Sequence, residues 1–156
     1  MKAAEEKPIE VAAGLVFRDG KLLITRRPAA GHLGGLWEFP GGKREAGETF
    51  PQCLRRELQE ELGIRVEVGE LIEDLVHHYP ERTVRLKFFH CRWLRHEPRA
   101  ILCDALVWIT QGQLTDYAFP EADLRILEKL RQRPELWAEA APPKGNRAAE
   151  KENKGE

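Results

Sequence analysis

Residues 42–64 read GKREAGETFPQCLRRELQEELGI and contain the most informative pattern in the chain. The second half of this stretch carries the start and stop signals of a helix. Thr49 and Gln52, three residues apart, form a capping box at the start. Gly63 can adopt the left-handed conformation that ends a helix. The sequence therefore predicts a helix from Phe50 to Leu62.

Three glutamates stand on this predicted helix. Glu57, Glu60 and Glu61 lie at positions i, i+3 and i+4, so their side chains share one face. Like charges at these spacings repel each other, and a face that only meets solvent usually interleaves lysines. Taken alone, the triplet is still better explained as a solvated acidic face than as a metal site. The residues around it change that balance.

The whole stretch resembles the Nudix box, G-x5-E-x7-R-E-U-x-E-E-x-G-U, where U is an aliphatic residue. Every specified position matches: Gly42, Glu48, Arg56, Glu57, Leu58, Glu60, Glu61, Leu62, Gly63 and Ile64. From average composition, such a match arises by chance at about one in a billion starting points. Resemblance to the MutT-like branch of this family extends over most of the chain, through residues 25–27, 35–43, 105–108 and 119–123.

The resemblance implies an α/β (α+β) fold, an α/β/α sandwich of the Nudix type with a mixed β-sheet. The hydrophobic pattern agrees with it, because apolar runs between turn signals predict strands. The expected strands are Ile9–Phe17 and Lys21–Arg26, joined as a hairpin at Asp19-Gly20, then Ile64–Tyr79, Arg82–Leu94 and Asp104–Thr110. A second helix is expected at Glu121–Arg131, with Leu124, Leu127 and Leu130 at helical spacing.

The chain of 156 residues, 42% hydrophobic and 33% charged, suits a single globular domain. We expect that domain at residues 9–138, with a flexible N-terminus at 1–8 and a disordered tail at 139–156. From Pro142 onward no side chain is more apolar than alanine, so burial cannot offset the conformational entropy that ordering this segment would cost.

The overall charge and the cysteines exclude several classes of function. A net charge of −1 gives no general attraction to nucleic acid polymers or to membranes. No segment has the ~20 apolar residues of a membrane helix, and no signal peptide is present, so a cytoplasmic location is expected. Cys53, Cys91 and Cys103 form no disulfide framework and are expected to be reduced.

The resemblance also assigns roles to the residues of the box. The implied metal ligands are the Gly42 carbonyl and the carboxylates of Glu57, Glu60 and Glu61. Glu57 can also act as the base, and Arg56 would pair with Glu48 to hold the loop against the helix. A triphosphate repels a nucleophilic water, so a cation is needed to neutralise it. Oxygen ligands favour Mg²⁺, with Mn²⁺ as a substitute.

One further metal ligand is placed by resemblance in the loop before the last strand. The family often supplies a glutamate there, and the nearest positions of this chain run from Glu97 to Asp104, with Glu97 as the best candidate. If neither Glu97 nor Asp104 reaches the metal, the general base must come from Glu57 or its helix neighbours.

The substrate contacts expected by resemblance are Arg26, His32, Phe39, Tyr79, Arg82 and Asp123. Arg26 is expected to face the phosphates, whereas Arg27 is either a site residue or a solvated strand end. Asp123 is a departure, because MutT-type enzymes carry an asparagine there that bonds oxidised guanine. An ionised aspartate only accepts hydrogen bonds, which suits the amino group of cytosine or the N–H edge of guanine. Alternatively, Asp123 caps the second helix.

The implied function is magnesium-dependent hydrolysis of modified or oxidised nucleoside triphosphates to monophosphate and pyrophosphate, which sanitises the nucleotide pool and serves DNA repair. The sequence leaves 8-oxo-dGTP and modified CTP or dCTP both open. One alternative is hydrolysis of another nucleoside diphosphate derivative, such as ADP-ribose or a dinucleotide polyphosphate. Another is a non-catalytic module that senses nucleotides. The expected partner is a small nucleotide, bound by a monomer or homodimer.

Overall fold

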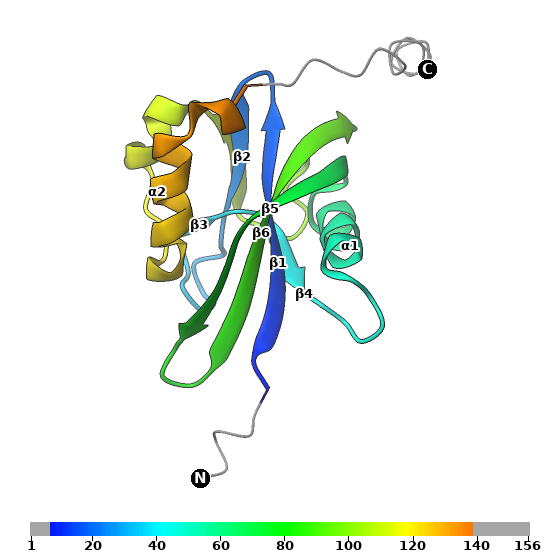
Figure 1. Cartoon of the computed structure of the whole chain (residues 1–156), viewed down its shortest axis with the longest axis vertical. Helices are drawn as coiled ribbons and strands as arrows, with labels where there is room; N and C mark the ends of the chain where they lie inside the picture. The colour runs from blue at the N-terminus through cyan, green and yellow to red at the C-terminus, as the bar shows by residue number, and fades with distance from the viewer. Residues whose placement is uncertain (1–6, 139–156) are drawn as a thin grey trace.

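The computed structural model describes residues 7–138, so most of the two predicted terminal segments lies outside the described residues. Within this range one seven-stranded sheet is flanked by helices (Figure 1). The strands are β1 (Ile9–Arg18), β2 (Lys21–Arg26), β3 (Trp37–Glu38), β4 (Gly41–Lys43), β5 (Arg65–His78), β6 (Thr83–Arg95) and β7 (Ala105–Ile109). The strands predicted from apolar runs are confirmed to within two residues, and β4 was not foreseen as a strand of its own.

The sheet is mixed, as predicted. Its main order is β3-β2-β1-β6-β5, with β4 paired to β1 and β7 paired to β2. The β1–β6 pair is parallel and the other pairs are antiparallel. Asp19 and Gly20 make the predicted tight turn between β1 and β2, both with positive φ, 53° and 77°.

Strand β1 lies in the centre of the sheet and is buried on both faces. Because side chains alternate along a strand, its residues divide between two hydrophobic clusters. Ala12 and Val16 pack with the helix α1 (Phe50–Leu62), whose stripe is Leu54, Leu58 and Leu62. Ala13, Leu15 and Phe17 pack on the other side with α2 (Leu124–Gln132), through Ile126, Leu127 and Leu130. The predicted α/β/α sandwich is therefore confirmed (Figure 1).

The second helix differs from its prediction at its start. Residues Glu121–Asp123 form a single 3-10 turn, η3, and the α-helix begins only at Leu124. Of the three leucines predicted to face the core, Leu127 and Leu130 are buried, whereas Leu124 is 59% exposed. Ile126, which the predicted spacing left out, is fully buried. Ion pairs from Lys129 and Arg125 to the buried Glu73 of β5 fasten α2 to the sheet.

The cysteines follow the prediction: all three are free, with Cys53 and Cys91 buried and Cys103 partly buried. Residues 7–138 contain no helix that is both long enough and apolar enough to cross a membrane.

Candidate active site

Local sequence fixes the register of α1 and hence the direction of its glutamates. The Thr49 hydroxyl accepts a hydrogen bond from the Gln52 amide at 3.1 Å, and the Gln52 side chain accepts one from the Thr49 amide at 2.8 Å. Gly63 closes the helix with φ 69°. The predicted capping box and stop are thus confirmed. Because the leucine stripe faces the sheet, the glutamates must lie along its flank.

Two glycines of β4 bring the backbone against this flank. Gly41 and Gly42 pair with Ala13 and Ala12 of β1. A Cβ at Gly41 would lie 1.9 Å from the Ala12 carbonyl oxygen, and one at Gly42 would lie 2.2 Å from the carboxyl carbon of Glu57. At Gly41 the clash is with backbone, so only glycine allows this close approach; at Gly42 a Cβ would displace the Glu57 carboxylate from its place against β4.

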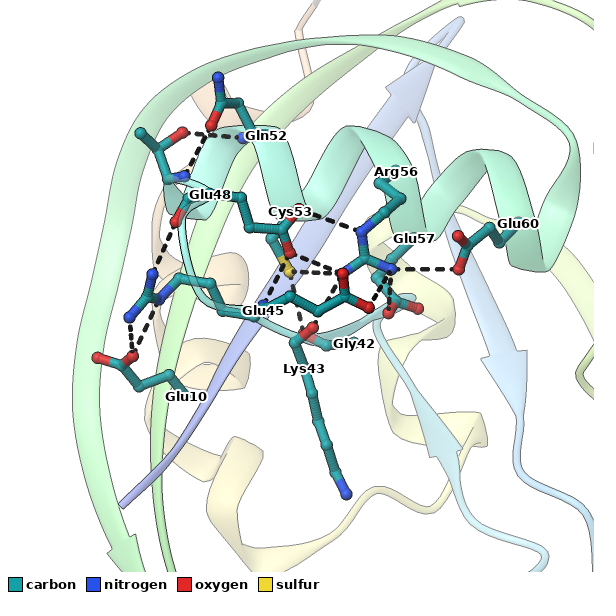
Figure 2. Close-up of polar contacts among 12 residues, drawn as sticks. Glu10, Gly42, Lys43, Glu45, Glu48, Gln52, Cys53, Arg56, Glu57 and Glu60 are labelled. Atoms are coloured by element: carbon teal, nitrogen blue, oxygen red, sulfur yellow. Dashed lines mark hydrogen bonds and ion pairs between the residues drawn. The ribbon is translucent and has the colours of Figure 1, made fainter. Parts of the chain in front are cut away.

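Arg56 joins the loop before α1 to the helix (Figure 2). Its Nε and Nη2 donate to the two carboxylate oxygens of Glu48, at 3.1 and 2.7 Å, and Nη2 also donates to the Lys43 carbonyl at 3.1 Å. These hydrogen bonds lower the pKa of Glu48 to about 2. The predicted Arg56–Glu48 pair is confirmed as a contact. Nη1 reaches Glu57 at 3.0 Å and Glu60 at 3.2 Å.

A cavity of about 780 Å³ opens beside α1 and β4, a size that suits a nucleotide. Its lining includes eight of the residues expected in the site: Gly42, Glu57, Glu61, His32, Phe39, Tyr79, Arg82 and Asp123. These residues come from five separate parts of the chain. The structure thus brings most of the predicted metal and substrate residues to one cavity.

Glu57 and Glu61 form an acidic end of this cavity. Burial, followed by the negative charges of Glu57 and Glu38, raises the pKa of Glu61 to about 8. Burial also raises the pKa of Glu57. Carboxyl groups whose charges are disfavoured in this way are typical of sites that take a cation, since a positive ion would relieve both causes. The donor set, carboxylates beside a glycine backbone, fits a hard divalent ion.

Glu60 does not share this position. It is absent from the cavity lining, its side chain is 53% exposed, and Arg56 holds it on the outer flank of the helix. Over residues 7–138, no three His, Cys, Asp or Glu side chains stand close enough together to enclose a metal ion. The three glutamates predicted to converge are therefore divided, two in the cavity and one beside it.

Arg26 lies elsewhere than predicted. It is the last residue of β2, and its guanidinium pairs with Asp104 at 3.0 Å, outside the cavity lining. Arg27 lines the cavity instead, because consecutive side chains on an extended chain point in opposite directions. Its Nη1 donates to Glu38 at 2.6 Å and its Nε to the His32 carbonyl at 2.8 Å.

Glu97 is not brought to the acidic end either. It is paired with Arg18 at 3.0 and 3.2 Å, and its side chain is 73% exposed. Arg18 ends β1, roughly 16 Å along the strand from Ala13, which pairs with Gly41. Asp104 is engaged by Arg26. Neither acid of this loop lines the cavity, whereas Glu57 and Glu61 of α1 do.

Asp123 lies in the cavity wall and is only 7% exposed. It occupies the cap position of α2, but its side chain makes no capping hydrogen bond, so the capping alternative is wrong. Burial, followed by the negative charge of Glu38, raises its pKa to about 7. Tyr79 shares the lining, with its ring edge-on to His32 at 5.3 Å between centroids. This end of the cavity therefore combines a buried acid with an aromatic wall.

One cavity residue of consequence, Glu38, was not among the predicted site residues. It lies in β3, opposite Thr25 of β2, and adds a carboxylate to the cavity lining, whose charge raises the pKa values of Glu61 and Asp123. The available signal was a single acid inside the apolar run Leu36-Trp37-Glu38-Phe39.

Comparison with known proteins agrees with this architecture. The family model of the NUDIX domain matches residues 12–129, and the chain belongs to that family. It is 40% identical to a CTP pyrophosphohydrolase of Escherichia coli K12 over 122 residues, which cover 78% of this chain and 90% of the relative. It is 35% identical to an 8-oxo-dGTP diphosphatase of the same organism over 127 residues, covering 81% and 98%.

Solved structures give the same result. The solution structure of the E. coli ORF135 protein has a TM-score of 0.69 at 38% identity, covering 80% of this chain and 89% of that one. A MutT structure from work on Aliivibrio salmonicida and Vibrio cholerae has a TM-score of 0.68 at 28% identity, covering 82% and 99%. Nudix hydrolases generally need a divalent metal ion.

Proposed function

We propose that this protein is a magnesium-dependent hydrolase that cleaves modified or oxidised nucleoside triphosphates to monophosphate and pyrophosphate, and so sanitises the nucleotide pool. The observation that carries the proposal is one cavity with the Glu57–Glu61 pair at one end and the buried acid Asp123 at the other. The polyphosphate of a nucleotide suits the first end, where a metal ion would bridge it to the glutamates. The nucleobase suits the second end. The two E. coli relatives, a CTP pyrophosphohydrolase and an 8-oxo-dGTP diphosphatase, support the same reaction class.

Glu57 and Glu61, with the Gly42 carbonyl, would hold Mg²⁺, and Glu60 stands next to them on the helix. When bound, the ion supplies charge neutralisation and a lowered pKa for water. Glu57 is the proposed base, because the acids of the loop at 97–104 pair with Arg18 and Arg26 instead. Water would attack the β-phosphorus of the triphosphate, so that the nucleoside monophosphate leaves and pyrophosphate forms.

Asp123 is proposed to recognise the nucleobase of the substrate by hydrogen bonds. Its carboxyl is buried in the cavity wall and makes no capping bond, so it is available to a ligand. Charged, it accepts from the amino group of cytosine or the N–H edge of guanine; protonated, it can also donate. Both 8-oxo-dGTP and modified cytidine triphosphates fit this description, which agrees with the two relatives.

Pyrophosphate release from a panel of canonical and oxidised triphosphates, with ADP-ribose included, tests the reaction. We expect magnesium-dependent turnover of at least one triphosphate. Glu61→Gln should lower kcat by orders of magnitude, because it removes a carboxylate at the acidic end, while Glu60→Gln should lower it less. Glu128→Gln, an exposed glutamate of α2, is the control. Wild-type turnover in Glu61→Gln, or hydrolysis of ADP-ribose alone, would contradict the proposal.

A further inference from the structure

The Arg27–Glu38 pair belongs to the wall of the cavity. Both residues line it, and both side chains are about one-third exposed, at 33% and 30%. Arg27 is held from two sides, by the Glu38 carboxylate at 2.6 Å and by the His32 carbonyl at 2.8 Å. A guanidinium has five N–H donors, so three of those on Arg27 have no hydrogen-bond partner within residues 7–138.

The pair is close enough to both groups of acids to act on them through its charges. The charge of Glu38 acts on Glu61 at the acidic end and on Asp123 at the base end, raising the pKa of both. The charge of Arg27 acts on Asp123 and on Tyr79 in the opposite sense. A nucleotide that reached both ends would therefore pass close to the guanidinium.

We propose that Glu38 is a positioning residue, which holds the Arg27 guanidinium so that its remaining N–H donors meet the nucleotide between the metal-bound phosphates and the base. The inference rests on the proposed function, because it assumes that a nucleotide fills the cavity. Arg27 carries the direct contact, and Glu38 acts through it.

The expected benefit is preorganisation. A free arginine side chain loses rotamer entropy when a ligand orders it, and this loss weakens binding. The Glu38 carboxylate and the His32 carbonyl restrict Arg27 before the ligand arrives. Removing the Glu38 charge should therefore weaken nucleotide binding and leave the chemical step largely intact.

The experiment is a double-mutant cycle on the full chain, with Glu38→Gln, Glu38→Asp, Arg27→Ala and the double variant Arg27→Ala/Glu38→Gln. We measure KM and kcat for the best triphosphate, and the Kd of a non-hydrolysable analogue with Mg²⁺. Glu38→Gln should raise KM and Kd about three- to tenfold with little change in kcat. Arg27→Ala should raise them roughly 10- to 100-fold, and Glu38→Gln should then add nothing. Glu38→Asp should fall between wild type and Glu38→Gln.

The matched control is Asp74→Asn. Asp74 binds Arg85 at 2.9 and 3.1 Å and is 32% exposed, so it resembles Glu38, but it lies outside the cavity lining. Its KM should equal that of the wild type, and thermal unfolding of every variant shows whether the fold persists.

Three results would overturn the inference: an unchanged KM and Kd in Glu38→Gln, an additive double variant, or a changed Mg²⁺ requirement at unaltered nucleotide affinity. The last result would place Glu38 in the metal site instead. A wild type that binds the analogue without releasing pyrophosphate would refute the proposed function alone, since Kd still reports on Glu38. Absence of binding would refute both.

Discussion

Glu48 and Glu61 are glutamates of the same box, yet their surroundings move their pKa values in opposite directions. Hydrogen bonds from Arg56 bring the pKa of Glu48 to about 2, so it stays charged and holds the loop. Burial beside Glu57 and Glu38 brings that of Glu61 to about 8, so its charge is disfavoured until a cation is present. At the scale of single residues, structural and chemical roles are separated by environment and not by residue type.

Asp123 gives a prediction about pH. Its pKa rises from the usual 3.8 to about 7 in the folded protein, so the unfolded chain releases this proton first as pH increases. Stability contributed by Asp123 is therefore lost between pH 4 and pH 7. The variant Asp123→Asn cannot ionise and should gain on the wild type by about 2 kcal/mol between pH 5 and pH 7, with only a few tenths of a kcal/mol more above pH 7.

Urea unfolding of both proteins from pH 5 to pH 9 measures this difference. We subtract the free energy of unfolding of the wild type from that of Asp123→Asn at each pH. The contributions of the other acids cancel in this difference, provided they titrate alike in both proteins. A difference that does not vary with pH would show that Asp123 is ionised in the folded state throughout this range.

At the scale of elements, α1 is fixed by local signals and α2 by its packing. The start and the end of α1 were predicted, because the capping box and Gly63 act within a few residues of the chain. Its buried leucine stripe was predicted from the helical spacing. The first turn of the predicted second helix is a 3-10 turn instead. Lys129 and Arg125 of α2 pair with Glu73, which lies on a strand more than fifty residues away in the sequence. No local pattern announces such contacts.

The capping box supplies a prediction for α1. Replacing Thr49 with alanine removes the acceptor of the Gln52 amide, which should cost about 1 kcal/mol of stability. The glutamates stand two turns or more along the helix, so kcat should change little. Chemical denaturation and pyrophosphate release measure the two effects. Thr115→Ala, at an exposed position, is the control and should be neutral. A loss of turnover larger than the loss of stability would mean that the helix start also orders the site.

At the scale of the whole molecule, the site joins residues from strands, loops and both helical layers. Its parts are brought together by the sheet, in which β1 pairs with β4 and β6, and β2 with β3 and β7. Such a site exists only in the folded chain, so ligand binding should stabilise the folded state.

We therefore expect Mg²⁺ and a non-hydrolysable triphosphate together to raise the melting temperature. At a ligand concentration 100 times Kd the stabilisation is about 2.7 kcal/mol, or roughly 5–10 °C for a chain of this size. Either component alone should give much less, because the metal is proposed to bridge the acidic end and the phosphates. Thermal unfolding with each combination measures the shift, and Glu61→Gln should largely abolish it. An equal shift without Mg²⁺ would argue that the phosphates bind elsewhere.

The fold class, the long strands, the helix α1 and the pairing of Arg56 with Glu48 were all predictable from the sequence, whereas β4 was not. The predictable features depend on short spacings, or on a pattern whose positions are fixed relative to one another. The sequence also selected eight residues of the cavity, through a resemblance that carries residue types along the chain.

The tertiary structure alone decided which side chains meet. It placed Arg27 and not Arg26 at the cavity, paired Glu97 with Arg18, divided Glu60 from Glu61, and brought Glu38 into the same cavity lining as two acids from distant segments. The physical reason is that a side chain's direction at a strand end, and the partner it finds, depend on strand pairing and burial. Those are set by residues far along the chain, and no local spacing encodes them.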